Sequence, residues 1–158
     1  MDWIVQKSVE LGVSEIVPMA TARAVVKLDE KKAKKKTERW QAVSESAAKQ
    51  AGRGKIPEVK QVMGFSEALT YAGTLDHVLI PYELAEGMEE TRRQIFLSES
   101  RGSIGNFDRP GWGDLRWRKW ERLWSWQELF QSLFGKRILR TETAGLFVLS
   151  VLSYLMEP

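Results

Sequence analysis

The feature that most constrains this chain is an alternation of short buried-strand patterns with helical patterns along its 158 residues. The clearest strand pattern is His77–Glu83, HVLIPYE, a continuous apolar run with Pro81 near its carboxyl end. Weaker strand patterns cover Val13–Met19, Ala24–Leu28 and Glu58–Met63. Strands that alternate with helices favour an α/β domain, so we expect a mostly parallel sheet with helices on both faces.

Four helical segments accompany these strands. The first is expected to run from Asp2, as its capping residue, to about Leu11, with Gly12 as its stop. A short helix is expected over Ser66–Ala72. The apolar stretch Ala144–Met156 is too short to span a bilayer and predicts a buried core helix.

The longest helix is expected over about Asp29–Arg53, with Gly52 and Gly54 ending it, and its second half is amphipathic. Its apolar stripe consists of Trp40, Val43, Ala47 and Ala51, and its polar stripe of Arg39, Ser46, Gln50 and Arg53. The lysine run Lys31–Lys36 opens this helix. Such a run either reaches phosphates or forms an ordinary solvated helix start, and both interpretations stay open.

Composition excludes several classes of site. The chain has no cysteine, which rules out disulfides and thiolate metal ligands and fits a reducing cytoplasmic location. Its one histidine, His77, starts a buried strand, where a structural role is the commoner one, and no metal-binding cluster surrounds it. The N-terminus lacks a signal-peptide pattern. We expect a cytoplasmic protein with neither a membrane partner nor a metal.

Residues 98–134 depart from this pattern, because five of the seven tryptophans lie within Trp112–Trp126, interleaved with arginines and lysines. Such a run is compatible with an RNA-binding helix, a membrane-surface helix or a solvated basic helix. A shifted reading frame is the better hypothesis. Back-translating Gly113–Phe134 and moving the frame by two bases gives GFTVEEVGAAVELAGAVPVTF, an ordinary sequence. Shifting the reading frame of Asp108–Gly113 by one base in the same way gives IGPDGG. We therefore expect this segment to pack poorly.

The stretch GKRILRTETAGL, Gly135–Leu146, resembles the C-terminal cofactor loop of the RsmE family of SPOUT-class methyltransferases. MDWIVQKSVELGVSEIVPMATARAVVK and ERWQAVSESAAKQAGRGKIPEV are similar to two further signatures of that family. The resemblance covers about residues 1–97 and 135–158. Members methylate N3 of a uridine in small-subunit ribosomal RNA with S-adenosylmethionine, and they are homodimers.

The resemblance implies one SPOUT methyltransferase domain over residues 1–158, with a C-terminal trefoil knot. The chain departs from the family in two ways. The family's N-terminal β-barrel RNA-binding domain is absent, and the family's GPEGG turn is replaced by the anomalous residues 98–134. If that segment is out of frame, the knot is disrupted.

The resemblance also assigns the cofactor contacts, to the loop after His77–Glu83 and to the last motif. These are Ile80, Pro81, Tyr82, Glu83, Gly135, Ile138, Leu139, Arg140, Thr141, Glu142 and Ala144. An alternative for Thr141–Thr143 is capping of the last helix, since threonines with a nearby glutamate satisfy free amides there.

Methyl transfer needs in-line positioning, and the N3 proton of uracil must leave, so a base or a stabilising cation would help. We assign catalytic roles to Arg140 and Arg23. RNA contacts are assigned to Arg23, Arg39, Gln50 and Arg53. The alternatives are a surface ion pair of Arg140 with Glu142, and a solvated face for the others.

The sequence thus predicts a homodimeric, S-adenosylmethionine-dependent methyltransferase acting on uridine N3 of small-subunit ribosomal RNA. The alternative is an inactive, truncated or frameshifted fragment that folds or dimerises without catalysis.

Overall fold

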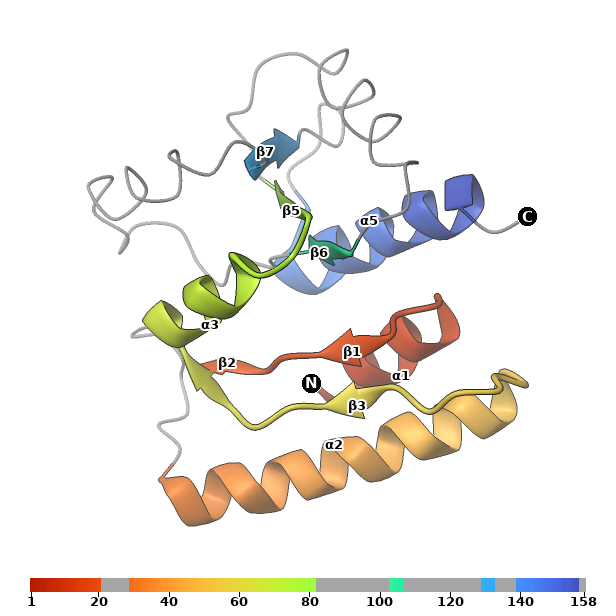
Figure 1. Cartoon of the computed structure of the whole chain (residues 1–158). Coiled ribbons are helices and arrows are strands. Elements are labelled where there is room, and N and C mark those ends of the chain that lie inside the picture. Colours follow the sequence, from red (N-terminus) through yellow and green to blue (C-terminus); the bar gives the residue numbers. More distant parts are fainter. Residues whose placement is uncertain (21–28, 82–102, 107–128, 133–138, 157–158) are drawn as a thin grey trace. The chain divides into compact units, whose positions relative to one another are not determined.

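A computed structural model describes residues 1–20, 29–81, 103–106, 129–132 and 139–156. The chain forms two compact units, Met1–Ala68 and Leu69–Pro158, and each is treated by itself below (Figure 1). Every strand pair in the described part of the chain is parallel, which confirms the expected α/β fold with parallel strands. The strand predicted over Ala24–Leu28 lies outside the described residues, and the trefoil knot stays a prediction.

The first unit is built from two helices and two pairs of very short strands. Its elements are α1 (Asp2–Glu10), β1 (Glu15–Ile16), β2 (Met19–Ala20), α2 (Glu30–Gln50), β3 (Glu58–Val59) and β4 (Met63–Gly64). The single strands predicted over Val13–Met19 and Glu58–Met63 were wrong in extent, because β1 pairs with β3 and β2 pairs with β4 as separate ladders. Pro18 lies where the first ladder ends, and its carbonyl accepts a hydrogen bond from the Met63 amide at 2.9 Å.

The core of the first unit lies between α1, α2 and the strands. One cluster consists of Val5, Trp40 and Val59, and a second consists of Val9, Ala47 and Ala48. Three of the four residues of the predicted apolar stripe on α2 contribute to these clusters. The fourth, Ala51, is exposed, because the helix ends at Gln50 and Ala51 is its C-cap.

Polar side chains on the inner face of α2 hold the start of β3. Ser44 is fully buried, and its hydroxyl donates to the Pro57 carbonyl at 2.8 Å. The Gln41 amide oxygen accepts from the Val59 backbone N–H at 2.8 Å. A buried hydroxyl costs little when it is hydrogen-bonded, so these contacts fix β3 against the helix without destabilising the core.

Glycines end both long helices of the first unit in the same way. Gly12 follows α1 at φ 93° and Gly52 follows α2 at φ 66°. In each case the next residue returns a hydrogen bond to the last turn: Val13 to Ser8 at 3.1 Å, and Arg53 to Ala48 at 2.9 Å. This is the Schellman geometry, which confirms the two stops expected from the glycines.

The N-cap expected at Asp2 was wrong. The residue lies within the first turn of α1, and its side chain makes no capping hydrogen bond. Its carboxylate instead accepts hydrogen bonds from the Arg39 guanidinium and, at 3.2 Å, from the Trp40 indole N–H on α2. Asp29, by contrast, does cap α2, since its carboxylate accepts from the Lys32 amide at 2.8 Å.

In the second unit a three-stranded parallel sheet is accompanied by helices. Helix α3 (Phe65–Ala72), at the boundary between the units, leads into β5 (His77–Pro81), β6 (Ile104–Asn106), β7 (Leu129–Ser132) and α5 (Thr141–Met156). The strand order is β6-β5-β7. Strands β6 and β7 lie inside residues 98–134, but most of that segment lies outside the described residues, so the expectation that it packs poorly stays a prediction.

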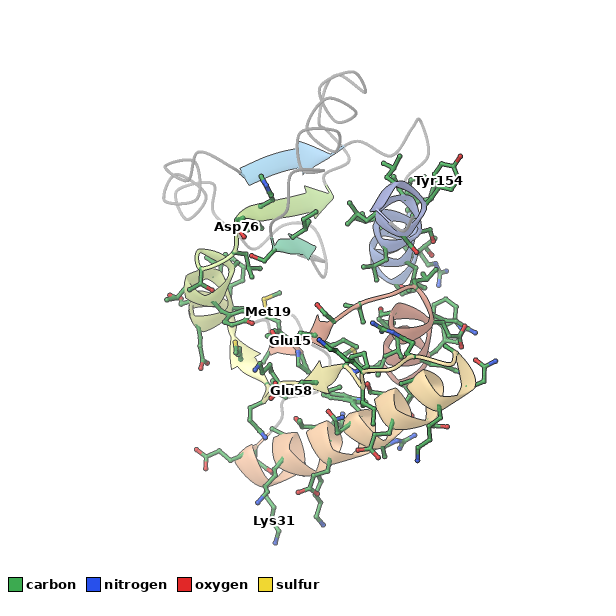
Figure 2. All side chains as sticks on the ribbon, turned by 45° about the vertical axis from the view of Figure 1, so that its right-hand side comes forward. Glu15, Met19, Lys31, Glu58, Asp76 and Tyr154 are labelled. Atoms are coloured by element: carbon green, nitrogen blue, oxygen red, sulfur yellow. The ribbon has the colours of Figure 1, made fainter. Side chains whose placement is uncertain are left out.

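Helix α5 is only partly buried, which corrects the prediction of a fully buried core helix. Ala144 and Val148 are buried, with 9% and 1% of their surface exposed. Phe147 and Tyr154, two turns apart, are 42% and 86% exposed, and Tyr154 projects away from the ribbon in Figure 2. A helix with one covered and one uncovered apolar face is typical of a protein surface or an interface.

Candidate cofactor site

The carboxyl ends of three parallel strands meet at one edge of the second unit's sheet. Strand β5 ends at Pro81, β6 at Asn106 and β7 at Ser132. The chain passes from β5 to β6 on one side and then crosses to β7 on the other side. In open parallel sheets, ligands bind outside the carboxyl ends of the strands where the direction of winding reverses. The candidate site is therefore the edge at which β5 and β7 end.

Two of the predicted cofactor residues form the end of the central strand. Ile80 is in register with Gln131, and Pro81 with Ser132. The predicted residues Tyr82, Glu83, Gly135 and Ile138 lie outside the described residues.

The other predicted cofactor residues lie at the start of α5. The Arg140 carbonyl accepts hydrogen bonds from the Thr143 and Ala144 amides, both at 2.8 Å, so Arg140 holds the N-cap position. Thr141 is the first helical residue, which corrects the expectation that it caps the helix. Leu139 is half-buried and Ala144 is buried. Free amides and the helix dipole make this end attractive to anions, and Glu142 in the first turn is stabilised there for the same reason.

The Arg140 guanidinium extends into solvent at the start of α5. Its side chain is 87% exposed, and its Nη1 atom lies 3.9 Å from Glu142 Oε1. The ion pair considered as an alternative role is thus present. An exposed pair at that distance contributes little to stability, so it leaves the guanidinium free to engage a substrate.

A clamp between Asp76 and Ser103 holds β6 against β5, and the sequence analysis missed it. The Asp76 carboxylate accepts the Ser103 backbone N–H and the Ser103 hydroxyl, each at 2.7 Å. The Asp76 amide donates to the Ser103 hydroxyl oxygen at 3.1 Å. Hydrogen bonds from the Ser103 amide, and then from its hydroxyl, hold the pKa of the Asp76 carboxyl below its ordinary value. The clamp sets the register of the strands whose far ends form the site.

Replacing Asp76 by Asn is expected to destabilise the second unit at neutral pH. Because the folded-state pKa is lowered, the charged form stabilises the fold above the unfolded pKa of about 3.9, and this contribution disappears as the pH falls through the folded pKa. Urea midpoints of the two proteins should therefore differ at pH 7 and converge in strong acid. A constant difference across that range would contradict the role of the charge. Ser103→Ala, which keeps the backbone donor, should show a smaller loss.

Of the residues predicted to bind RNA, Arg39 and Gln50 lie on α2 and Arg53 follows just after it. Arg39 is 71% exposed and pairs with Asp2, and Gln50 is exposed at the end of the helix. Arg23 lies outside the described residues. The predicted RNA contacts of all three stay predictions.

Arg53 has a role in the fold that the sequence analysis did not foresee. Its Nη1 atom donates to the carbonyls of Val9 and Val13 at 3.0 and 2.6 Å, and its Nη2 atom donates to Gly12 at 3.1 Å. The guanidinium thus covers the carboxyl end of α1, where free carbonyls and the helix dipole favour a cation. RNA contact by Arg53 stays a prediction, and the side chain meanwhile joins the ends of α1 and α2.

In the part of the chain that the structure describes, no group of three or more histidines, cysteines or carboxylates is placed to hold a metal ion. None of the described helices is both long and apolar enough to cross a membrane.

The model of the RNA methyltransferase domain family matches residues 1–105. This chain belongs to that family. The chain is similar to ribosomal RNA small subunit methyltransferase E of Bacillus subtilis (strain 168), with 39% identity over 159 residues, covering 99% of this chain and 62% of that protein. The resemblance to the RsmE family is thereby confirmed. The chain spans about three-fifths of the length of such relatives.

Comparison with solved structures gives the same family likeness. A putative methyltransferase from Legionella pneumophila, in complex with bound S-adenosylmethionine, is 30% identical with a TM-score of 0.81. Ribosomal RNA small subunit methyltransferase E from Neisseria gonorrhoeae, bound to S-adenosylmethionine, is 29% identical with a TM-score of 0.72. Each match covers 98% of this chain, and 61% and 60% of the respective structures. The comparisons therefore do not favour the alternative of a fragment without catalysis.

Proposed function

We propose that this chain is the catalytic domain of an enzyme that transfers a methyl group from S-adenosylmethionine to N3 of a uridine in small-subunit ribosomal RNA. The observation that carries the proposal is the sheet edge where β5 and β7 end, in a chain whose relatives are ribosomal RNA methyltransferases. Solved structures of the same fold contain S-adenosylmethionine.

The residues proposed to hold S-adenosylmethionine suit the parts of that molecule. Ile80 and Leu139 are apolar residues at the end of β5 and just before α5, as contacts with an adenine ring require. The carboxylate of the methionine part suits free amides at a helix start, which α5 provides. When bound, the cofactor supplies an electrophilic methyl group.

The chain's own residues would orient the base and stabilise its charge. Uracil N3 reacts as an anion once its proton has left, and a nearby cation stabilises that anion. Arg140 is exposed at the start of α5 and is our candidate for this cation. Arg23 is proposed for the same charge-stabilising role, and Arg39 and Gln50 for contacts with the RNA.

We further propose that the domain works as a homodimer. Phe147 and Tyr154 lie seven residues apart on one face of α5 and are 42% and 86% exposed. Exposed aromatic side chains in one row are costly in water and are enriched at protein interfaces. A second copy of the chain would cover them, and sedimentation velocity of the Tyr154→Glu variant against the unchanged chain tests this.

Calorimetric titration with S-adenosylmethionine tests cofactor binding. Affinity in the micromolar range, about −8 kcal/mol, is expected. Transfer of a labelled methyl group to small-subunit ribosomal RNA tests the reaction. A methyl at N3 blocks base pairing, so primer extension should stop at the modified uridine. The absence of both binding heat and thermal shift would refute the proposal, and labelled RNA without such a stop would refute the N3 assignment alone.

A further inference from the structure

The first turns of α2 carry a row of cations along one line of the helix. Lys31, Lys35 and Arg39 are spaced by four residues, so they lie about 6 Å apart along the helix axis on nearly the same face. All three are exposed. Lys31 extends away from the strands in Figure 2. The opposite face carries the buried Thr37, Trp40 and Ser44, so the row, here called the basic stripe, points outward.

The basic stripe is unfavourable for the isolated helix. Like charges four residues apart repel, and lysines near the start of a helix oppose its dipole. No ion pair within the described residues involves Lys31 or Lys35, whereas Lys32 is paired with Asp29 at 2.9 Å. Within the helix, Lys31 has only lysines three and four residues away, Lys34 and Lys35, whereas Lys35 has Lys31, Lys32 and Arg39 at such spacings and a single acid, Glu38. A charge arrangement that costs helix stability is explained by a partner of opposite charge.

Lys34 provides the contrast within the same run. It is exposed, like its neighbour Lys35, but it lies about 100° further round the helix. Its four-residue neighbours in both directions are acids, Glu30 and Glu38. Lys34 therefore has the surroundings expected of a lysine that stabilises the helix.

We propose that the basic stripe of Lys31, Lys35 and Arg39 is a docking line for the RNA phosphate backbone, and that Lys34 is not part of it. The inference rests on the proposed function, because a ribosomal RNA substrate supplies the polyanion. Contacts of this kind position the RNA without reading its sequence. Of the lysine run Lys31–Lys36, the proposal thus assigns only Lys31 and Lys35 to RNA binding.

The test compares Lys35→Gln and Lys31→Gln/Lys35→Gln with Lys34→Gln. The probe is a fluorescent small-subunit ribosomal RNA fragment, and binding is followed by anisotropy over a range of salt concentrations. Each phosphate contact contributes about 0.7 to 0.9 to the slope of the logarithm of the binding constant against the logarithm of the salt concentration. Removing one lysine contact should therefore weaken RNA binding about four- to five-fold at 0.15 M salt. The double variant is expected to bind about 20-fold more weakly, with a slope reduced by about 1.5.

Thermal unfolding separates charge docking from damage to the fold. Lys35→Gln should unfold at the same or a higher temperature, since it relieves repulsion. Lys34→Gln should unfold slightly earlier but bind RNA within about two-fold of the unchanged chain.

Equal RNA affinities for Lys34→Gln and Lys35→Gln would overturn the stripe while leaving the proposed function intact. No RNA binding by the unchanged chain would overturn both. A different result would overturn the assignment to RNA: the unchanged chain binds anionic phospholipid vesicles but not RNA, and Lys31→Gln/Lys35→Gln loses the vesicle binding.

Discussion

Replacing Arg140 by Ala is expected to lower the single-turnover methylation rate about 100- to 1,000-fold, the range seen when one preorganised charge-stabilising donor is removed. The guanidinium lies at the start of α5, 87% exposed, with only a 3.9 Å ion pair to Glu142. It is therefore available to the anion that forms at uracil N3. The affinity for S-adenosylmethionine should change by less than about three-fold, because the loss falls on the reacting base.

Two further variants make this expectation specific. Arg140→Lys keeps the charge but not the planar fork of donors, so an intermediate rate is expected. Glu142→Gln removes the weak ion pair but also changes a predicted cofactor contact, so its loss should appear in the affinity for S-adenosylmethionine rather than in the rate at saturating cofactor. An Arg140→Ala rate within about two-fold of the unchanged chain would contradict the catalytic assignment.

Replacing Arg53 by Ala is expected to lower the free energy of unfolding of the first unit by about 2–4 kcal/mol. The side chain donates to three backbone carbonyls at and just beyond the end of α1. Hydrogen bonds from charged donors are stronger than neutral ones, and partly buried carbonyls lose their partners when the donor is removed. Urea unfolding followed by circular dichroism measures the loss.

The matched control is Lys49→Ala, an exposed cation at the same end of α2, for which a change within about 0.5 kcal/mol is expected. Arg53→Lys should fall between the two, since it keeps a cation near the helix dipole but cannot reach all three carbonyls. Unchanged stability of Arg53→Ala together with weaker RNA binding would reverse the assignment and make Arg53 an RNA ligand.

The helices were more predictable than the strands. Gly12 and Gly52 correctly predicted where α1 and α2 end, because a helix stop depends on the conformation of a single residue. The strands over Val13–Met19 and Glu58–Met63 were predicted too long. An alternating side-chain pattern indicates where the backbone is extended. The length of a strand, however, depends on how far its partner strand pairs with it, and the local sequence carries no information about that partner.

By itself the sequence determined the family, the helix ends and the motif that begins α5. Only the tertiary structure decided which groups those residues meet. Asp2 reaches Arg39 across 37 residues, and Arg53 reaches Val9 across 44. The Asp76 clamp depends on Ser103, 27 residues further along the chain. Local signals act within a few residues, whereas such partners are chosen by how strands and helices pack. A charged residue that the sequence predicts to be solvent-exposed or ligand-binding can therefore have a structural role in the fold.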